Sequence, residues 1–398
     1  FFKKFRPFFF QQHTLRHSAM DEYRSKPMYR YLIMMAIAAA VGLQAWQTLF
    51  NNFAVEVAGL EGKHVGVIQS VREIPGFLAL LAIYVMLIIK EHRLSALSIL
   101  LLGIGLGITG MFPTFVGLMF ATLISSFGFH YYETTNKSLT LQYFNQQQAP
   151  RVFGRQYSIA AASNIGIGLF IYLISFFFNY SQTYMVIGLF IVAIAVWGFF
   201  QNPEQTDLTP QRKQIILRKK YWLFYFLTFM AGARRQIFMA FAVFLLVKRF
   251  EYSVQEVTIL FVINNVINYY MAPLIGKSII RFGERKVLSM EYSSLIFVFL
   301  AYAFVESRWI VAVLYILDHI FFGFAMAINT YFQKVGNPRD IAPSMAVGFT
   351  INHIAAVVLP ALGGLLWMVD YRIPFIAGAC MSAVSLAAVQ LIRTNSKP

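Results

Sequence analysis

Long apolar runs constrain this chain more than any other feature of its sequence. They recur along all 398 residues, and each approaches the roughly 20 residues that a helix needs to cross the hydrocarbon core of a bilayer. Hydrophobic residues make up 58% of the chain and charged residues 13%, which is about half the usual charged share of a soluble protein. A soluble globular domain is therefore excluded, and the sequence predicts an all-α, polytopic membrane protein.

We predict twelve transmembrane helices, with six on either side of a polar loop at residues 201–220, called the linker below. Two prolines interrupt the linker and five basic residues lie in it, which favours a position on the cytoplasmic side of the membrane. The predicted division is a basic aromatic segment 1–27, a bundle 28–200, the linker, a bundle 221–392 and a tail 393–398. The predicted spans are 29–49, 65–89, 95–111, 115–141, 157–178, 183–200, 221–247, 254–280, 287–305, 309–331, 344–368 and 374–392.

The formal net charge of +16 is explained by its distribution along the chain. If the spans alternate from a cytoplasmic N-terminus, most of the 33 Lys and Arg fall in cytoplasmic segments or at the cytoplasmic ends of spans, and Arg72, Arg234 and Arg235 are those deeper within spans. This is the positive-inside bias of membrane proteins, so no nucleic-acid partner is expected and both termini are predicted to be cytoplasmic. The single cysteine, Cys380, lies in a predicted span and excludes a disulfide framework within the chain.

The two halves also resemble weak repeats of one another. Arg151 follows a proline before the fifth span, with Asn164 further along, and Arg339 and Asn352 repeat this spacing at the eleventh span. Internal repeats of this kind are typical of secondary transporters.

A loop motif between the eighth and ninth spans resembles that of the major facilitator superfamily. The matching positions are Gly276, Arg281, Gly283, Arg285 and Lys286. Ile280 stands where the family has an acidic residue, which puts the family's charge latch at this loop in question. The resemblance implies two pseudo-symmetric six-helix bundles, alternating access, and a central cavity lined by spans one, four, seven and ten. By resemblance, that cavity is lined by Gln44, Gln47, His130, Glu133, Arg234, Arg235 and Asp318.

Ionisable side chains are costly at membrane depth, so those within spans are functional candidates. Candidate substrate-binding residues are Arg234, Arg235, Gln44, Gln47, Arg72, Asn264, Asn268 and Tyr269. Candidate proton-coupling residues are Glu133, Asp318, Glu73 and His130. No cofactor, metal site or catalytic grouping is expected.

The sequence suggests specific partners for two pairs of adjacent charged residues. Arg234 and Arg235 diverge by about 100° around a helix, so we expect one to meet an anionic substrate and the other to be structural. Glu73 is expected to compensate an arginine of the seventh span or to stay protonated, while Arg72 turns towards the cavity. The alternative is that Arg72 and Glu73 neutralise each other.

Other charged and polar residues have plainer interpretations. Lys137 is expected to snorkel to the membrane surface. His319 and His353 are expected to act as structural hydrogen-bond donors.

These features predict a monomeric secondary active transporter in the cell membrane that moves a small anionic or zwitterionic organic solute, coupled to protons. The direction of transport stays open. A drug–proton antiporter is the alternative, although the fifth span lacks the proline of the glycine-proline motif typical of such exporters. A multi-pass membrane enzyme, disfavoured by the short loops, and a non-transporting sensor of the same fold are minor alternatives.

Overall fold

A computed structural model describes residues 22–60, 62–203, 209, 211–212, 214–252 and 254–393. Most of the predicted segment 1–27 and of the tail 393–398 lies outside these residues, as do several linker positions. Within the described residues the chain is helical and has no strand.

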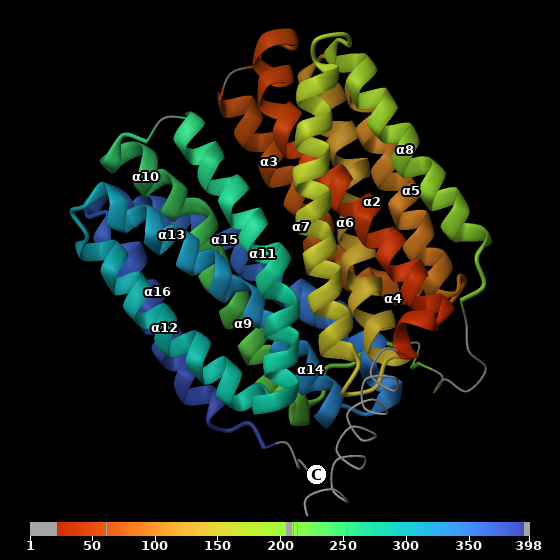
Figure 1. The fold of residues 1–398 in the computed structure, drawn as a ribbon, viewed down its shortest axis with the longest axis vertical. Helices are drawn as coiled ribbons and strands as arrows, with labels where there is room; N and C mark the ends of the chain where they lie inside the picture. The colour runs from red at the N-terminus through yellow and green to blue at the C-terminus, as the bar shows by residue number, and fades with distance from the viewer. Residues whose placement is uncertain are drawn as a thin grey trace, which may run out of the picture.

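Two helical bundles lie side by side, one from each half of the chain (Figure 1). The N-terminal bundle contains α2 (Pro27–Asn52), α3 (Gly62–Phe77), α4 (Ala82–Val85), α5 (Glu91–Thr109), α6 (Phe115–Tyr143), α7 (Ala149–Ile174) and α8 (Tyr180–Phe200). The C-terminal bundle contains α9 (Trp222–Ile237), α10 (Val243–Phe250), α11 (Val254–Phe282), α12 (Glu284–Phe304), α13 (Arg308–Phe322), α14 (Met326–Val335), α15 (Ile341–Val369) and α16 (Arg372–Val389).

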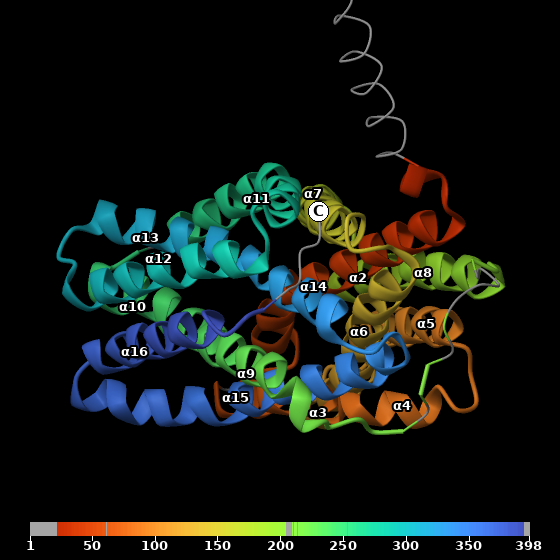
Figure 2. The same cartoon turned by 90° about the horizontal axis from the view of Figure 1, so that it is seen from below.

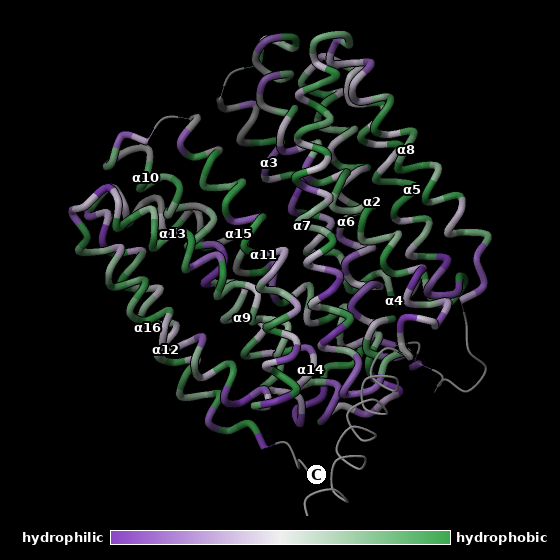
Figure 3. Tube along the Cα trace, viewed as in Figure 1, coloured by the Kyte–Doolittle hydropathy of each residue, from purple (hydrophilic) through white to green (hydrophobic). Residues whose placement is uncertain are grey.

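Ten helices are long and apolar enough to cross a membrane in the described part of the chain. They correspond to ten of the twelve predicted spans. The other two predicted spans fall on α15 and on α9 with α10, which a π-helical segment, η5 (Phe238–Ala242), joins into one rod. Hydrophobic residues predominate along these rods, while hydrophilic residues gather towards the end at which α14 lies (Figure 3).

Local sequence signals account for the helix boundaries. Thr114 accepts a hydrogen bond from Gly117 N at the start of α6, and Asn179 forms a capping box with Gln182 at the start of α8. Between α11 and α12 the backbone turns at Gly283, whose φ of 79° favours glycine.

Glycines allow the helices of the N-terminal bundle to approach closely. A Cβ at Gly105 would lie 2.5 Å from Ser125 N, and one at Gly188 would lie 2.5 Å from the Cα of Gly107. The helices α5, α6 and α8 therefore pack backbone to backbone, as small residues permit in membrane helices.

The two bundles touch along two edges (Figure 2), where α7 lies beside α11 and α15 lies beside α3. On the first edge, Ser158 Oγ donates to Tyr269 O over 2.6 Å, and Asn164 Nδ2 donates to Asn265 Oδ1 over 3.1 Å. On the second edge, Leu80 N donates to Thr350 Oγ1 over 3.0 Å.

We call the end of the bundles at which α8 ends and α9 begins the linker end. Here Gln333 Nε2 of α14 donates to the carbonyl oxygens of Leu141 and Phe144, over 2.8 and 2.6 Å. Gly154 also packs against Ala272, where a Cβ at Gly154 would lie 2.6 Å from Ala272 O. The bundles are thus closed against each other at the linker end.

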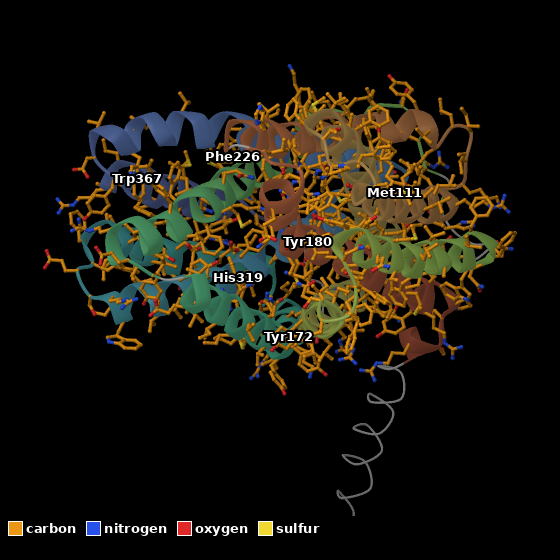
Figure 4. All side chains as sticks on the ribbon, turned by 90° about the horizontal axis from the view of Figure 1, so that it is seen from above. Met111, Tyr172, Tyr180, Phe226, His319 and Trp367 are labelled. Atoms are coloured by element: carbon orange, nitrogen blue, oxygen red, sulfur yellow. The ribbon has the colours of Figure 1, made fainter. Side chains whose placement is uncertain are left out.

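Figure 4 looks onto the opposite end, with Tyr180 on the N-terminal bundle and His319 and Trp367 on the C-terminal bundle. Nearer to this end, α7 carries Gly166 and Gly168, and an added Cβ at either would meet no atom within 4 Å. The close α7–α11 packing around Gly154 therefore does not extend to this part of α7.

The second part of the linker lies on the C-terminal bundle. Gln211 Nε2 donates to Pro338 O over 2.9 Å, and Arg212 N donates to Arg339 O over 2.8 Å. Gln211 and Arg212 also line a cavity of about 390 Å³ at the linker end, together with the segment that follows α4. None of the charged residues described next lines this cavity.

Candidate functional site

Charged and imidazole side chains gather where α3, α6, α9 and α15 meet between the bundles. We call this set the central cluster, and it consists of Arg72, Glu73, His130, Glu133, Lys137, Arg235 and His353. Five of these residues were predicted as site residues from the sequence, and Lys137 and His353 are additions.

On α3, Arg72 and Glu73 pair with each other. Arg72 Nη2 and Nε donate to Glu73 Oε1 over 2.9 and 3.2 Å, and the guanidinium lies 4.7 Å from the ring centre of Trp46. The expectation that Glu73 would compensate an arginine of the seventh span is therefore wrong. Although adjacent Cβ atoms diverge around a helix, the long arginine side chain folds back to its neighbour.

Two histidines, one from each bundle, lie against each other in the cluster. The rings of His130 and His353 are 4.9 Å apart between centres and nearly perpendicular. His353 Nε2 lies 3.8 Å from Glu73 Oε2 across the interface, so His353 does more than donate to its own helix. Both histidines are almost fully buried, at 6% and 3% exposed.

One turn further along α6, Glu133 is paired with Lys137. Lys137 Nζ donates to Glu133 Oε1 over 2.8 Å and also lies 4.7 Å from the ring centre of Phe349 on α15. The expectation that Lys137 snorkels to the surface is wrong, because its ammonium group is held at the interface by these two contacts.

Arg235 is the guanidinium of the cluster without a direct partner. It is half-buried, its carbon lies 5.5 Å from the ring centre of Phe322, and it lies within electrostatic range of Glu133 and His353. Among the described residues it has no ion pair or hydrogen bond through its side chain. Its donors are therefore available to a ligand.

The neighbouring Arg234 points into the C-terminal bundle instead. It is 4% exposed, donates to Ser385 Oγ, lies 3.9 Å from Glu291 Oε1, and stacks on Tyr292 at 4.1 Å. The two arginines thus diverge as expected, and Arg234 is held by groups of its own bundle.

Asp318 does not reach the central cluster. It is 4% exposed and lies near Arg234 and Glu291, inside the C-terminal bundle. The resemblance placed its helix at the cavity but could not fix which side of the helix Asp318 occupies. Sequence reasoning missed Glu291, although an acidic residue within a predicted span was a signal that could have identified it.

The remaining predicted site residues are spread over other surfaces. Gln44 Nε2 donates to Thr48 Oγ1 over 3.2 Å on α2, and Gln47 is exposed. Asn268 Nδ2 lies 2.8 Å from His319 Nε2, while Tyr269 contributes its carbonyl to the contact with α7. Asn264 is 1% exposed, and neither polar atom of its side chain has a hydrogen-bond partner among the described residues.

The loop motif lies at the linker end, and only one of its two glycines forms the turn. Gly283 forms the turn, but Gly276 lies inside α11, where a side chain would collide with Pro150 of α7. A glycine is therefore required at position 276 for α11 and α7 to touch. Of the basic residues, Arg285 donates to Gln390 Oε1 over 3.2 and 3.0 Å, and Arg281 lies over Phe282.

Two helical bundles of membrane-spanning character, with half-buried ion pairs and two buried histidines between them, have the architecture of a multi-pass membrane transporter. The chain belongs to the Major Facilitator Superfamily, whose family model matches residues 35–347 and 224–398. This confirms the predicted family and the expectation of a transporter rather than an enzyme. No curated protein sequence matches the chain.

Several solved transporter structures are similar to this chain at low sequence identity. The human organic anion transporter TETRAN has a TM-score of 0.74 and 10% identity, over 92% of this chain and 99% of that one. The fucose:proton symporter of E. coli has a TM-score of 0.72 and 13% identity, over 92% and 98%. A bacterial homologue of the iron transporter ferroportin, in an outward-facing state, has a TM-score of 0.72 and 14% identity, over 91% and 98%. These similarities show the fold.

Proposed function

We propose that this protein is a secondary active transporter of a small anionic organic solute in the cell membrane, working by alternating access and coupled to protons. The observation that carries the proposal is Arg235, a half-buried guanidinium between the bundles with no ion pair or hydrogen bond of its own among the described residues. A guanidinium pairs in bidentate fashion with a carboxylate or phosphate, so an anion would satisfy it.

The charges around Arg235 favour an anion over a cationic drug. Glu73 is already paired with Arg72, and Glu133 with Lys137, so both carboxylates of the cluster are compensated. Arg235 then adds one uncompensated positive charge. A drug–proton antiporter that takes lipophilic cations would need the opposite balance, and it is the less supported alternative.

Glu133 is the residue that we propose to couple protons to the anion. It lies between Lys137, with which it is paired, and Arg235, which interacts with it electrostatically. An anion bound to Arg235 would weaken that attraction and favour protonation of Glu133. Proton and anion would then move together.

The orientation of the protein is part of the same proposal. The basic linker and the other basic segments support a cytoplasmic linker end, together with cytoplasmic termini. The bundles are in contact at that end, so the structure would represent a state closed to the cytoplasm. Rocking the bundles about the central cluster would then open the linker end.

Flux measurements in proteoliposomes test this function. A thermal-shift screen of organic anions in detergent identifies a binding compound, and its uptake is then followed together with internal pH. We expect saturable anion uptake with proton movement, and we expect Glu133→Gln to retain counterflow of labelled anion while losing pH-driven accumulation. Absence of anion binding in the screen, together with binding of lipophilic cations, would contradict the proposal.

A further inference from the structure

We propose that Glu73, His130 and His353 form a binding site for one divalent transition-metal ion between the two bundles. One carboxylate oxygen of Glu73 and one ring nitrogen of each histidine all lie within 4.8 Å of one another. Glu73 on α3 and His130 on α6 come from the N-terminal bundle, and His353 on α15 comes from the C-terminal bundle. No metal was expected from the sequence, in which these three residues do not follow a metal-ligand spacing.

The hydrogen bonds of the two imidazoles leave each with one basic nitrogen. His353 Nδ1 lies 2.9 Å from Phe349 O, and His130 Nε2 lies 3.3 Å from Arg72 O. A carbonyl oxygen only accepts, so these two nitrogens carry the protons. His353 Nε2 and His130 Nδ1 therefore keep their lone pairs in the neutral rings.

This arrangement matches the surroundings of metal-binding histidines. Such histidines almost always donate their second ring nitrogen to a carbonyl or carboxylate, which fixes the tautomer and the ring orientation. In addition, His130 Nδ1 is buried and has no hydrogen-bond partner among the described residues, on a side chain that is only 6% exposed. A buried lone pair without a donor is costly, and a metal ion held by Glu73 and the two histidines would satisfy it once this nitrogen faces the ion.

Glu73 has one carboxylate oxygen, Oε2, left to bind a metal ion. Arg72 occupies Glu73 Oε1 with both of its hydrogen bonds, while Oε2 lies 3.8 Å from His353 Nε2. Metal–nitrogen and metal–oxygen bonds of about 2.0–2.2 Å place neighbouring ligands roughly 3.4 Å apart in tetrahedral geometry. The observed separation is within about 0.5 Å of that distance, so this pair needs little movement to bind.

Two imidazoles and one carboxylate select the class of ion. Imidazole suits zinc, iron, nickel and copper, whereas calcium and magnesium prefer sites made of oxygen ligands. Three protein ligands leave at least one coordination position for water or for an anion. The site is therefore expected to take Zn²⁺ readily and to bind Mg²⁺ poorly.

The position of the ligands makes metal binding depend on conformation. Gly76 lies directly beside His353, since a Cβ at Gly76 would lie 2.7 Å from His353 Nε2. Only the close approach of α3 and α15 brings the third ligand into place. A metal ion bound to all three would stabilise this conformation over one in which the bundles separate here.

Calorimetry with Zn²⁺ on the full chain, freed of metal by a chelator in detergent, tests the site. We expect one saturable Zn²⁺ per chain and at least about 10-fold weaker binding in Glu73→Gln, His130→Ala and His353→Ala, since even the loss of an outer hydrogen-bond partner costs that much. The matched control is His319→Ala, which removes a half-buried imidazole that pairs with Asn268 instead. It should bind Zn²⁺ as the unchanged protein does.

Two further variants keep the test decisive if an alanine variant fails to fold. Gly76→Ala retains all three ligands but displaces the His353 ring, so it should also weaken Zn²⁺ binding. In a Cys380→Ser background, His353→Cys keeps a ligand, and with Co²⁺ it should give the near-ultraviolet charge-transfer band of a cobalt thiolate. No saturable Zn²⁺ binding, or undiminished binding in His353→Ala or Gly76→Ala, would overturn the proposal. None of these measurements requires transport. Failure of the metal proposal can therefore be distinguished from failure of the proposed transport function.

Discussion

Arg218 Nε donates to Asp340 Oδ2 over 2.8 Å, which ties the end of the linker to the start of α15. Asp340 is fully buried, Tyr221 donates to the same oxygen over 2.7 Å, and Arg212 approaches the other oxygen at 3.3 Å. One carboxylate thus holds two basic linker residues and a tyrosine at the linker end.

Asp340→Asn should destabilise the protein by about 1–3 kcal/mol, because it removes the charge that holds the two arginines while the arginines stay partly solvated. Thermal unfolding in detergent measures the change. Asp370→Asn is the matched control, since Asp370 is exposed at the opposite end. Equal melting of the Asp340 and Asp370 variants would show that the linker contact adds no stability.

Substitutions of the adjacent residues Arg234 and Arg235 should have different effects, the first on stability and the second on anion binding. Arg235→Lys keeps the charge but loses the planar fork, so anion affinity should fall by about 10-fold while melting stays unchanged. Anion titration and thermal unfolding of the same preparations measure both effects. Arg234→Lys serves as the neighbouring control and should change stability instead. Full anion affinity in Arg235→Lys would remove Arg235 from the site.

Arg234 and Glu291 should be coupled in stability. Arg234→Met leaves the Glu291 carboxylate buried without its partner and should cost about 3–5 kcal/mol. Adding Glu291→Gln should restore part of that loss, because no unpaired charge remains. A double-mutant cycle from unfolding in detergent gives the coupling energy. Additive losses would show that the two side chains act independently.

Glycine 154 should control closure of the linker end. Gly154→Leu would push α7 from α11, because Ala272 lies against it, whereas Gly168→Leu on the same helix meets open space in this conformation. The approach of α7 to α11 further along the same edge can be followed by disulfide formation between Asn164→Cys and Asn265→Cys in a Cys380→Ser background, since the native side chains are hydrogen-bonded. We expect slower cross-linking with Gly154→Leu only. Equal rates in both leucine variants would contradict this role.

Membrane orientation is tested by labelling. Thr206→Cys in a Cys380→Ser background should be protected from an impermeant thiol reagent in intact cells and react after permeabilisation. Thr206 lies outside the described residues, and the test depends only on its place in the linker. Labelling from outside would reverse the proposed orientation.

The fold was largely predictable because membrane-spanning helices can be recognised in the sequence by the length and apolar composition of their segments. The site was only partly predictable, for two physical reasons. The direction of a long side chain is not fixed by its Cβ, so Arg72 could reach Glu73 despite their divergence. Helix rotation is set by packing, so the sequence could not tell that Asp318 faces Arg234 while His353 faces Glu73.

The attachment of Gln211 and Arg212 to the C-terminal bundle also limits how far the bundles can move apart. The tether that joins them runs only from the end of α8 at Phe200 to Gln211. At about 3.3–3.6 Å per residue, this stretch spans at most roughly 40 Å in any conformation. While those contacts hold, this stretch therefore sets a maximum distance between the two bundles at the linker end. The basic second part of the linker moves together with the C-terminal bundle.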